Sequence, residues 1–408
     1  VYIIPLDAGA SLLVSELAAD TNRCPQILVG NDLSKDSTKV TANDQGVDVK
    51  KPQVSRLSTR VVKTLQATNN AFLADHTIGE DQVFPTVCAI AWMSDACQTA
   101  YPGYHFQGFS DYKLFKGLTF SPETLVENQF VDYLIEMSVE DEQSNAVNDS
   151  TDLVIVDTKI SSKVLDENNL EKTIYHYGAK VLLSKSVHLA TVGQETAFLD
   201  EAQTELVNEF SAKGKYHSQD NELVALYRDG TLFHGESLQG ISKVLQCDES
   251  GLLLACRIPS IASDKQGDFP ISAQQNGHNI FANDIAYQAM LVWVKAKLGL
   301  GSLPSSTQGW TVYRQVELNE LFYLQLNVVK ATGTKAGSKR GALTADMSLF
   351  TQDKQLLAKI TGAKVTASDS LNSLFLPENT RGKRDTLIIE AQVDKKHKSQ
   401  SEEATAAQ

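Results

Sequence analysis

Residues 84–100 read FPTVCAIAWMSDACQTA, a run of apolar and small side chains with one acidic residue, Asp95. Pro85 suits the first turn of a helix, and the apolar residues recur at helical spacing. We therefore predict a buried helix over this segment. A second run of the same character, NDIAYQAMLVWVKAK, occupies residues 283–297 and predicts a second buried helix.

Segments typical of β-strands surround both predicted helices. They mix alternating polar and apolar positions with β-branched residues, as strands of antiparallel sheets do. An amphipathic helix is expected over residues 195–212, between the two groups. The sequence thus predicts an α+β fold of two similar halves, each an antiparallel sheet around one helix. The predicted strands are residues 106–120, 125–139, 151–158 and 180–183, then 241–258, 310–318, 321–331, 342–350, 356–365 and 386–393.

Changes in composition predict where the parts of the chain begin and end. Residues 1–32 are expected to be the end of a preceding domain, and the polar residues 33–53 a linker. The first half would span 54–190, the connecting helix and loop 191–221, and the second half 222–393. The charged residues 394–408 are expected to form a disordered tail.

Composition excludes several classes of protein. The 408 residues are 42% hydrophobic, enough to bury a large core, and the net charge of −13 includes no basic stripe for nucleic acid. The five cysteines form no CxxC pair, which favours a reduced, cytoplasmic compartment. No apolar run approaches the roughly 18 residues needed to cross a membrane, so we expect no membrane association.

His76 lies in the loop ADHTIGEDQVFP, residues 74–85, directly before the first buried helix. The free N–H groups of a helix start can bind a thioester carbonyl as it gains enolate charge, and a histidine beside it can remove an α proton. The alternative for a single histidine before a helix is a solvated loop residue.

Asp284 and Gln288 lie four residues apart, on one face of the second predicted helix. The structural alternative is that Asp284 lies in the first turn, where the helix dipole favours an acidic side chain, and that Asn283 caps the helix. The functional hypothesis is that burial against this helix raises the pKa of Asp284, so that it acts as a protonated acid with His76 as its partner.

Two motifs here resemble those of polyketide synthase dehydratases. His76, Gly79 and Pro85 resemble HxxxGxxxxP, with the histidine-to-proline spacing intact and the glycine three residues after the histidine instead of four. Asp284 and Gln288 match the family's DxxxQ/H motif in spacing.

A third element, residues 229–235, resembles YGPxFQG and retains Phe233 and Gly235, with Asp229 and Thr231 where Tyr and Pro are usual. The resemblance covers roughly residues 54–393 and is greatest to the large subunit of bacterial omega-3 polyunsaturated fatty acid synthases. Residues 1–32 resemble the end of the ketoreductase domain that precedes the dehydratase in such subunits.

The resemblance implies a double hot-dog fold that dehydrates 3-hydroxyacyl thioesters to trans-2-enoyl thioesters. The substrate would be carried on the phosphopantetheine arm of an acyl carrier protein. His76 would be the general base and Asp284 the general acid that protonates the departing 3-hydroxyl, which Gln288 would orient. N–H groups near Val87 and Cys88 would bind the carbonyl. The implied substrate-binding set is Gly79, Pro85, Val87, Cys88, Phe233 and Gly235.

The resemblance also implies partners, namely acyl carrier protein and other synthase domains, and a homodimer. No bound cofactor is expected, because no glycine-rich nucleotide fingerprint follows a strand. No metal is expected either, since His105, His176, His188 and His278 have no ligands at suitable spacing. Three alternatives stay open: a hot-dog thioesterase, double-bond isomerisation, and a non-catalytic unit for dimerisation or carrier docking.

Overall fold

The structure is a computed structural model of the 408-residue chain. It describes residues 58–126, 130–139, 153–185, 196–212, 221–258, 261–270, 279–333 and 337–376. The predicted domain remnant, linker, tail and final strand, at 1–32, 33–53, 394–408 and 386–393, lie outside the described residues.

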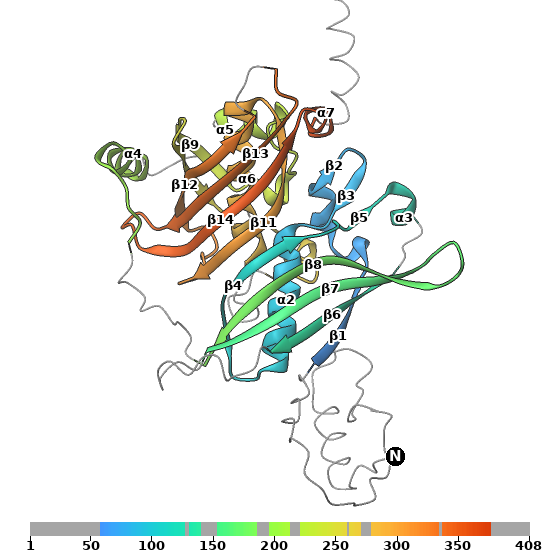
Figure 1. The fold of residues 1–408 in the computed structure, drawn as a ribbon. Helices are drawn as coiled ribbons and strands as arrows, with labels where there is room; N and C mark the ends of the chain where they lie inside the picture. The colour runs from blue at the N-terminus through green and yellow to red at the C-terminus, as the bar shows by residue number, and fades with distance from the viewer. Residues whose placement is uncertain are drawn as a thin grey trace, which may run out of the picture. The chain divides into compact units, whose positions relative to one another are not determined.

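The first half is an antiparallel sheet that curves around one helix, α2 (Thr86–Ala100) (Figure 1). Its strand order is β1-β6-β7-β8-β4. Helix α2 buries most of its side chains, including Trp92 and Met93, because it is apolar on nearly all sides and packs against the sheet. The strands are β1 (Ser58–Leu65), β4 (His105–Leu114), β6 (Val131–Val139), β7 (Leu153–Leu165) and β8 (Glu171–Ser184).

The second half repeats this arrangement around helix α6 (Ile280–Leu298), with strand order β11-β14-β13-β12-β10-β9. Every residue of α6 from Ile280 to Val294 is buried. The strands are β9 (Ile241–Cys247), β10 (Gly251–Arg257), β11 (Gly301–Val312), β12 (Leu321–Thr332), β13 (Arg340–Phe350) and β14 (Leu356–Ser368).

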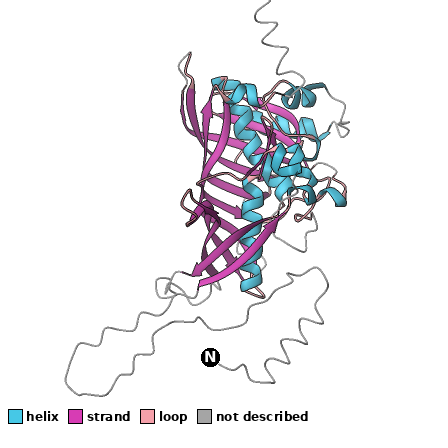
Figure 2. Ribbon diagram, turned by 90° about the vertical axis from the view of Figure 1, so that its right-hand side faces the viewer, coloured by secondary structure: helices cyan, strands magenta, loops and turns pink. Residues whose placement is uncertain are grey.

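The two halves share one sheet. Strand β4 of the first half pairs antiparallel with β11 of the second, with Ser110 opposite Gly309, and the result is a continuous 11-stranded sheet. Helices α2 and α6 contact each other on the same side of that sheet (Figure 2). The helices of the two halves therefore meet where the halves join.

Short elements complete the described structure. A small sheet combines β2 (Thr77–Ile78), β3 (Asp81–Val83) and β5 (Thr119–Phe120). The 3₁₀ helices include η2 (Ala71–Asp75) and η4 (Glu236–Leu238), and the remaining helices are α3 (Pro122–Val126), α4 (Glu201–Ala212), α5 (Asn221–Arg228) and α7 (Leu371–Leu374).

Several predicted elements differ from those of the structure. The strands predicted at 106–120 and 241–258 are each divided in two, and the helix predicted at 195–212 begins at Glu201. Helix α6 is capped four residues before the predicted cap Asn283, because Asn279 accepts hydrogen bonds from the N–H groups of Phe281 and Ala282. The strand predicted at 310–318 instead spans 301–312, directly after the left-handed Gly299 that ends α6. The segment predicted to enter a strand at residue 125 is still helical there, in α3.

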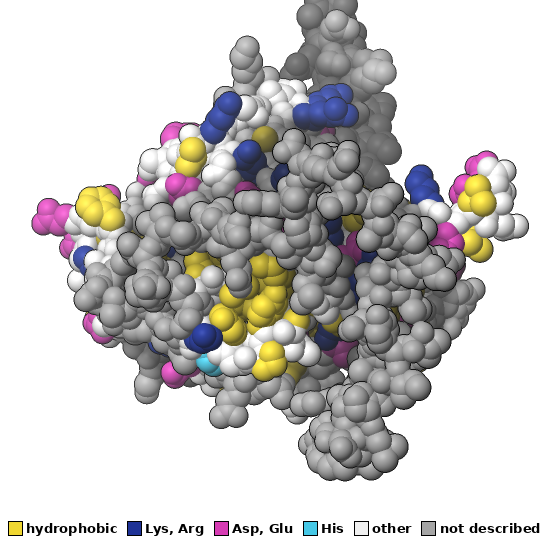
Figure 3. Space-filling model, turned by 60° about the horizontal axis from the view of Figure 1, so that its bottom comes forward, with side chains coloured by type: hydrophobic (Ala, Val, Ile, Leu, Met, Phe, Trp, Pro, Cys, Tyr) yellow, Lys and Arg dark blue, Asp and Glu magenta, His cyan; other side chains and the backbone are white. Residues whose placement is uncertain are grey.

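On the face shown in Figure 3, the described Lys and Arg side chains are scattered and form no stripe. Among the described residues, every helix is too short or too polar to span a membrane.

Candidate active site

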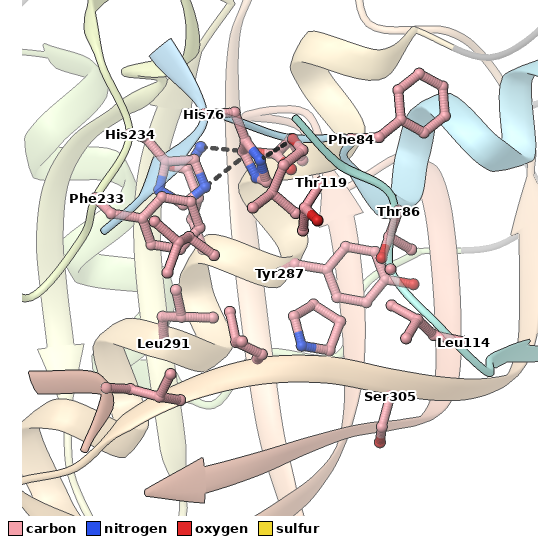
Figure 4. Close-up of a pocket in the computed structure, with 18 of the residues that line it drawn as sticks. His76, Phe84, Thr86, Leu114, Thr119, Phe233, His234, Tyr287, Leu291 and Ser305 are labelled. Carbon is pink, nitrogen blue, oxygen red and sulfur yellow. Dashed lines mark hydrogen bonds and ion pairs between the residues drawn. The ribbon is translucent and has the colours of Figure 1, made fainter. Parts of the chain in front are cut away.

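A cavity of about 540 Å³ lies between the two halves and takes its lining from both (Figure 4). The first half supplies His76, at the end of η2, and Thr86, at the start of α2. The second half supplies Asp284 and Gln288 from α6. Much of the remaining wall is apolar and includes Leu114, Leu291, Leu303 and Tyr287. The structure thus brings the two predicted catalytic motifs to one site.

The ring of His76 is fixed by its own loop. Its Nδ1 lies 2.7 Å from the carbonyl oxygen of Val83, and the Val83 N–H donates to the carbonyl of His76 at 2.9 Å. Because a carbonyl only accepts, Nδ1 carries the hydrogen in this contact. Nε2 of the neutral ring is therefore left with a lone pair that can accept a proton.

Burial keeps this imidazole neutral. Desolvation is the largest influence and lowers the pKa of His76 from 6.5 to about 4, with a further lowering from the charge of His234 and an opposing effect of Asp284. His76 is therefore unprotonated near neutral pH, which is the form a general base requires.

Asp284 is held by its neighbour on the helix. Gln288 donates from Nε2 to Oδ2 of Asp284 at 2.8 Å and to the carbonyl of Leu238, also at 2.8 Å. The other end of the amide is held as well, because the Tyr227 hydroxyl donates to Oε1 of Gln288 at 2.8 Å. The Tyr227 oxygen in turn accepts from the N–H of Ile241. Gln288 is thus locked in the orientation that presents N–H to the carboxylate.

The expectation that Asp284 has a raised pKa is wrong. Burial does raise it, and this is the largest single influence. The charge and hydrogen bond of His234, the charge of His76 and the hydrogen bond of Gln288 together outweigh burial and lower the pKa of Asp284 below its usual value. The carboxyl group is therefore ionised in the free protein, because the folded chain brings polar neighbours to it from distant segments.

His234 is a site residue that the sequence motifs did not reveal. Its Nε2 lies 3.3 Å from Oδ2 of Asp284, and its ring centroid is 5.2 Å from that of His76. The ring stacks on Phe233 at 4.1 Å, and the backbone forms an isolated β-bridge with His76. The sequence signal was available, since His234 stands where the third motif has glutamine.

Two predicted glycines support the site without lining the cavity. Gly79 has a positive φ of 70° in the turn between β2 and β3, and its N–H donates to the carbonyl of Leu374. Gly235 packs against Asp75, where an added Cβ would lie 2.2 Å from Oδ1. The N–H of Gly235 donates to the Asp75 carbonyl at 2.7 Å. Both glycines therefore shape the loops that carry the histidines.

The start of α2 differs in detail from the expectation. Pro85 is the N-cap residue, and the side chains of Val87 and Cys88 are buried in the core instead of lining the cavity. The N–H of Cys88 donates to the Pro85 carbonyl at 3.0 Å, so it is not available to bind a substrate carbonyl. Of the residues predicted to bind substrate, Phe233 is the one that lines the cavity.

The cluster has the composition of a metal site, which the spacing of the histidines in the sequence did not predict. His76, His234 and Asp284 offer nitrogen and oxygen atoms that all lie within 4.8 Å of one another. The Asp284 oxygen that pairs with His234 already accepts a hydrogen bond from Gln288, and His76 Nδ1 is bound to the carbonyl of Val83. We therefore treat the three as an acid–base group and assign no metal ligands.

Comparison with known proteins confirms the resemblance found in the motifs. No family model matches the chain. It is 28% identical over 333 residues to one of the subunits that form the polyunsaturated fatty acid synthase of Thraustochytrium, a match that covers 82% of this chain and 10% of that protein. The chain therefore spans about a tenth of the length of this curated relative.

Solved structures confirm the predicted fold. The dehydratase domains of the CurF and CurH modules of curacin polyketide synthase superpose with TM-scores of 0.52, at 14% and 15% identity. Each match covers 79% of this chain. The same matches cover 97% of the CurF domain and 96% of the CurH domain. A trans-AT polyketide synthase dehydratase domain from Brevibacillus brevis gives a TM-score of 0.50 at 15% identity, over 76% of this chain and 94% of that domain. The fold is the double hot-dog.

Proposed function

We propose that this chain dehydrates 3-hydroxyacyl thioesters to trans-2-enoyl thioesters. The observation that carries the proposal is that a neutral His76 and the Asp284–Gln288 pair face one cavity from opposite halves. Elimination of water needs a base for the C2 proton and an acid for the 3-hydroxyl. The similarity to part of a polyunsaturated fatty acid synthase and to polyketide synthase dehydratase domains supports this choice.

The first step uses His76. Its Nε2 takes the C2 proton, and the resulting imidazolium is stabilised by the carboxylate of Asp284 in the same cluster. The thioester carbonyl gains negative charge as the proton leaves. We assign the binding of that oxygen to the first N–H groups of α2, where Thr86 lines the cavity, because the first N–H groups of a helix have no acceptor within the helix.

The second step uses Asp284 and Gln288, on the side of the cavity formed by α6. The C3–O bond breaks while a proton from the Asp284 side of the cavity converts the leaving hydroxyl to water. Gln288 keeps Asp284 in place, because its amide is held at both ends by Tyr227 and Leu238. The apolar remainder of the cavity suits an acyl chain.

The proposal extends to how substrate arrives. An acyl carrier protein would present the thioester on its phosphopantetheine arm, within an assembly of other synthase domains. We also propose the homodimer, the cytoplasmic location and the domain limits given by the sequence. The non-catalytic alternative is less favoured because it would leave a buried acid–base group, costly to desolvate, without a use.

The test is a mass-spectrometric assay of a 3-hydroxyacyl carrier-protein thioester, following loss of one water or its gain in the hydrating direction. We expect the intact protein to exchange water, and His76→Ala and Asp284→Asn to be slower by at least ~100-fold. His105→Ala, an exposed histidine on β4, is the matched control and should keep full activity. No exchange by the folded intact protein would overturn the proposal, as would full activity in either site variant.

A further inference from the structure

His234 has no role in the two steps above, although it lies in the cavity and is only 4% exposed. Its Nδ1 is buried and has no hydrogen-bond partner in the part of the chain that the structure describes. Leaving a buried ring nitrogen unpaired costs free energy. Such a position calls for a functional explanation.

The geometry ties His234 to Asp284. Nε2 of His234 is 3.3 Å from Oδ2 of Asp284, and both side chains are at least nine-tenths buried. The His234 ring stacks on Phe233 and meets the His76 ring edge-on, so two aromatic contacts hold it in place. Among the described residues, the polar partner of the His234 ring is therefore the carboxylate that the proposed elimination needs as an acid.

The acid needs a source for its proton. An ionised Asp284 has nothing to give to a leaving hydroxyl until it receives a proton itself. The Gln288 amide that contacts it does not ionise. The other ionisable groups whose interactions reach Asp284, namely the phenols of Tyr227 and Tyr287 and the thiol of Cys88, are weaker acids than usual because burial raises their pKa. His76 must stay unprotonated to act as the base. His234 is the remaining donor in this part of the structure.

We propose that His234 stores the proton that the leaving hydroxyl takes, and delivers it through Asp284. This inference rests on the proposed dehydration. His76 Nε2 takes the C2 proton, the C2–H electron pair forms the C2–C3 double bond, and the C3–O bond breaks. The departing oxygen takes a proton from Asp284, which in the same step receives the Nε2 proton of the imidazolium form of His234 and leaves that ring as a neutral imidazole with its hydrogen on Nδ1. Water leaves, and the protein holds as many protons as before.

The proximity of the two histidines restores the resting state. After elimination His76 carries the C2 proton and His234 has lost one. Their ring centroids are 5.2 Å apart, with Asp284 within reach of both, so the proton can return from His76 to the His234–Asp284 pair. One cluster thus serves both steps, and no outside acid is consumed.

The test compares two leaving groups. A 3-hydroxyacyl pantetheine thioester needs a proton for its hydroxyl, whereas the 3-chloroacyl analogue releases chloride without one. The variant His234→Gln keeps an N–H donor for Asp284 but stores no proton. We expect it to lower kcat at least ~100-fold for the hydroxyl substrate and less than ~10-fold for the chloride. His76→Ala should lose both reactions, measured above the background rate.

The matched control is His176→Gln. His176 is another buried histidine, held by Ser162 and the carbonyl of Lys116 outside the cavity. It should leave the ratio of the two reactions unchanged, whatever it does to stability.

The outcomes separate this inference from the proposed function. Equal losses on both substrates in His234→Gln would assign His234 a structural role and overturn the inference, and so would no loss on either. An intact protein that dehydrates the hydroxyl substrate but cannot release chloride would also overturn it, because His76 alone suffices there. An intact protein that leaves the hydroxyl substrate unchanged would instead overturn the proposed function.

Discussion

Acid should destabilise this protein through His76 in particular. The pKa of the His76 side chain in the folded protein is about 4, against 6.5 for the same group when solvated, and the residue is 7% exposed. Between these two values the unfolded chain binds a proton that the folded chain does not. The stability that His76 contributes is therefore complete above the unfolded pKa and is lost as pH falls below it.

The magnitude follows from the two pKa values. The full difference corresponds to ~3 kcal/mol, of which ~2 kcal/mol is expressed on going from about pH 7.5 to about pH 5. Replacing His76 with glutamine removes this proton linkage. We therefore expect the free energy of unfolding to fall by ~2 kcal/mol more in the intact protein than in His76→Gln over that range.

The assay is urea unfolding of both proteins at the two pH values, followed by tryptophan fluorescence. His105→Gln is the matched control, since it removes an exposed histidine outside the cluster and should keep the pH dependence of the intact protein. Equal pH dependence in the intact protein and His76→Gln would refute the reasoning. That result would mean that the His76 ring titrates alike in the folded and unfolded chains.

Three further variants test the support around the site. Gly235→Ala puts a methyl group 2.2 Å from Oδ1 of Asp75, and because Asp75 directly precedes the proposed base, turnover should fall on the order of a hundredfold in the water-exchange assay. Tyr227→Phe leaves Oε1 of Gln288 without its donor and should cost about 1–3 kcal/mol of stability in urea unfolding. Asn279→Ala removes the cap of α6 and should cost ~1 kcal/mol in the same measurement.

The controls for Tyr227→Phe and Asn279→Ala are substitutions of the same kind at exposed positions. Tyr175→Phe, with a half-exposed ring on β8, and Asn168→Ala, in the exposed turn before it, should each change stability by less than ~0.5 kcal/mol. Equal effects in a site variant and its control would contradict the hydrogen-bond argument. Unchanged turnover in Gly235→Ala would show that the loop before the histidine tolerates the displacement of Asp75.

The sequence predicted the central helices well for a physical reason. Segments 84–100 and 283–297 are apolar on nearly every side, and such a helix is stable only when it is surrounded by other elements. The same burial explains why Asp284 and Gln288, four residues apart on α6, point into one cavity. These features depend on local spacing, which a single sequence contains.

What the sequence did not show depends on contacts between distant segments. His234 pairs with Asp284 from a different loop, and this contact helps to reverse the predicted direction of the Asp284 pKa. The cap of α6 was expected at Asn283, although Asn279 also precedes the apolar run, because composition alone does not distinguish two nearby asparagines. A single sequence does not contain the pairing of side chains that are distant along the chain, and the structure supplies it.

The pairing of β4 with β11 has a consequence for cutting the chain in two. These strands of 10 and 12 residues are joined by backbone hydrogen bonds, so separate expression of the halves would give each fragment a long open edge. Such edges are templates for pairing with other chains. Co-expressed halves should reassemble by pairing β4 with β11. Either half alone should aggregate or form a dimer through its open edge strand.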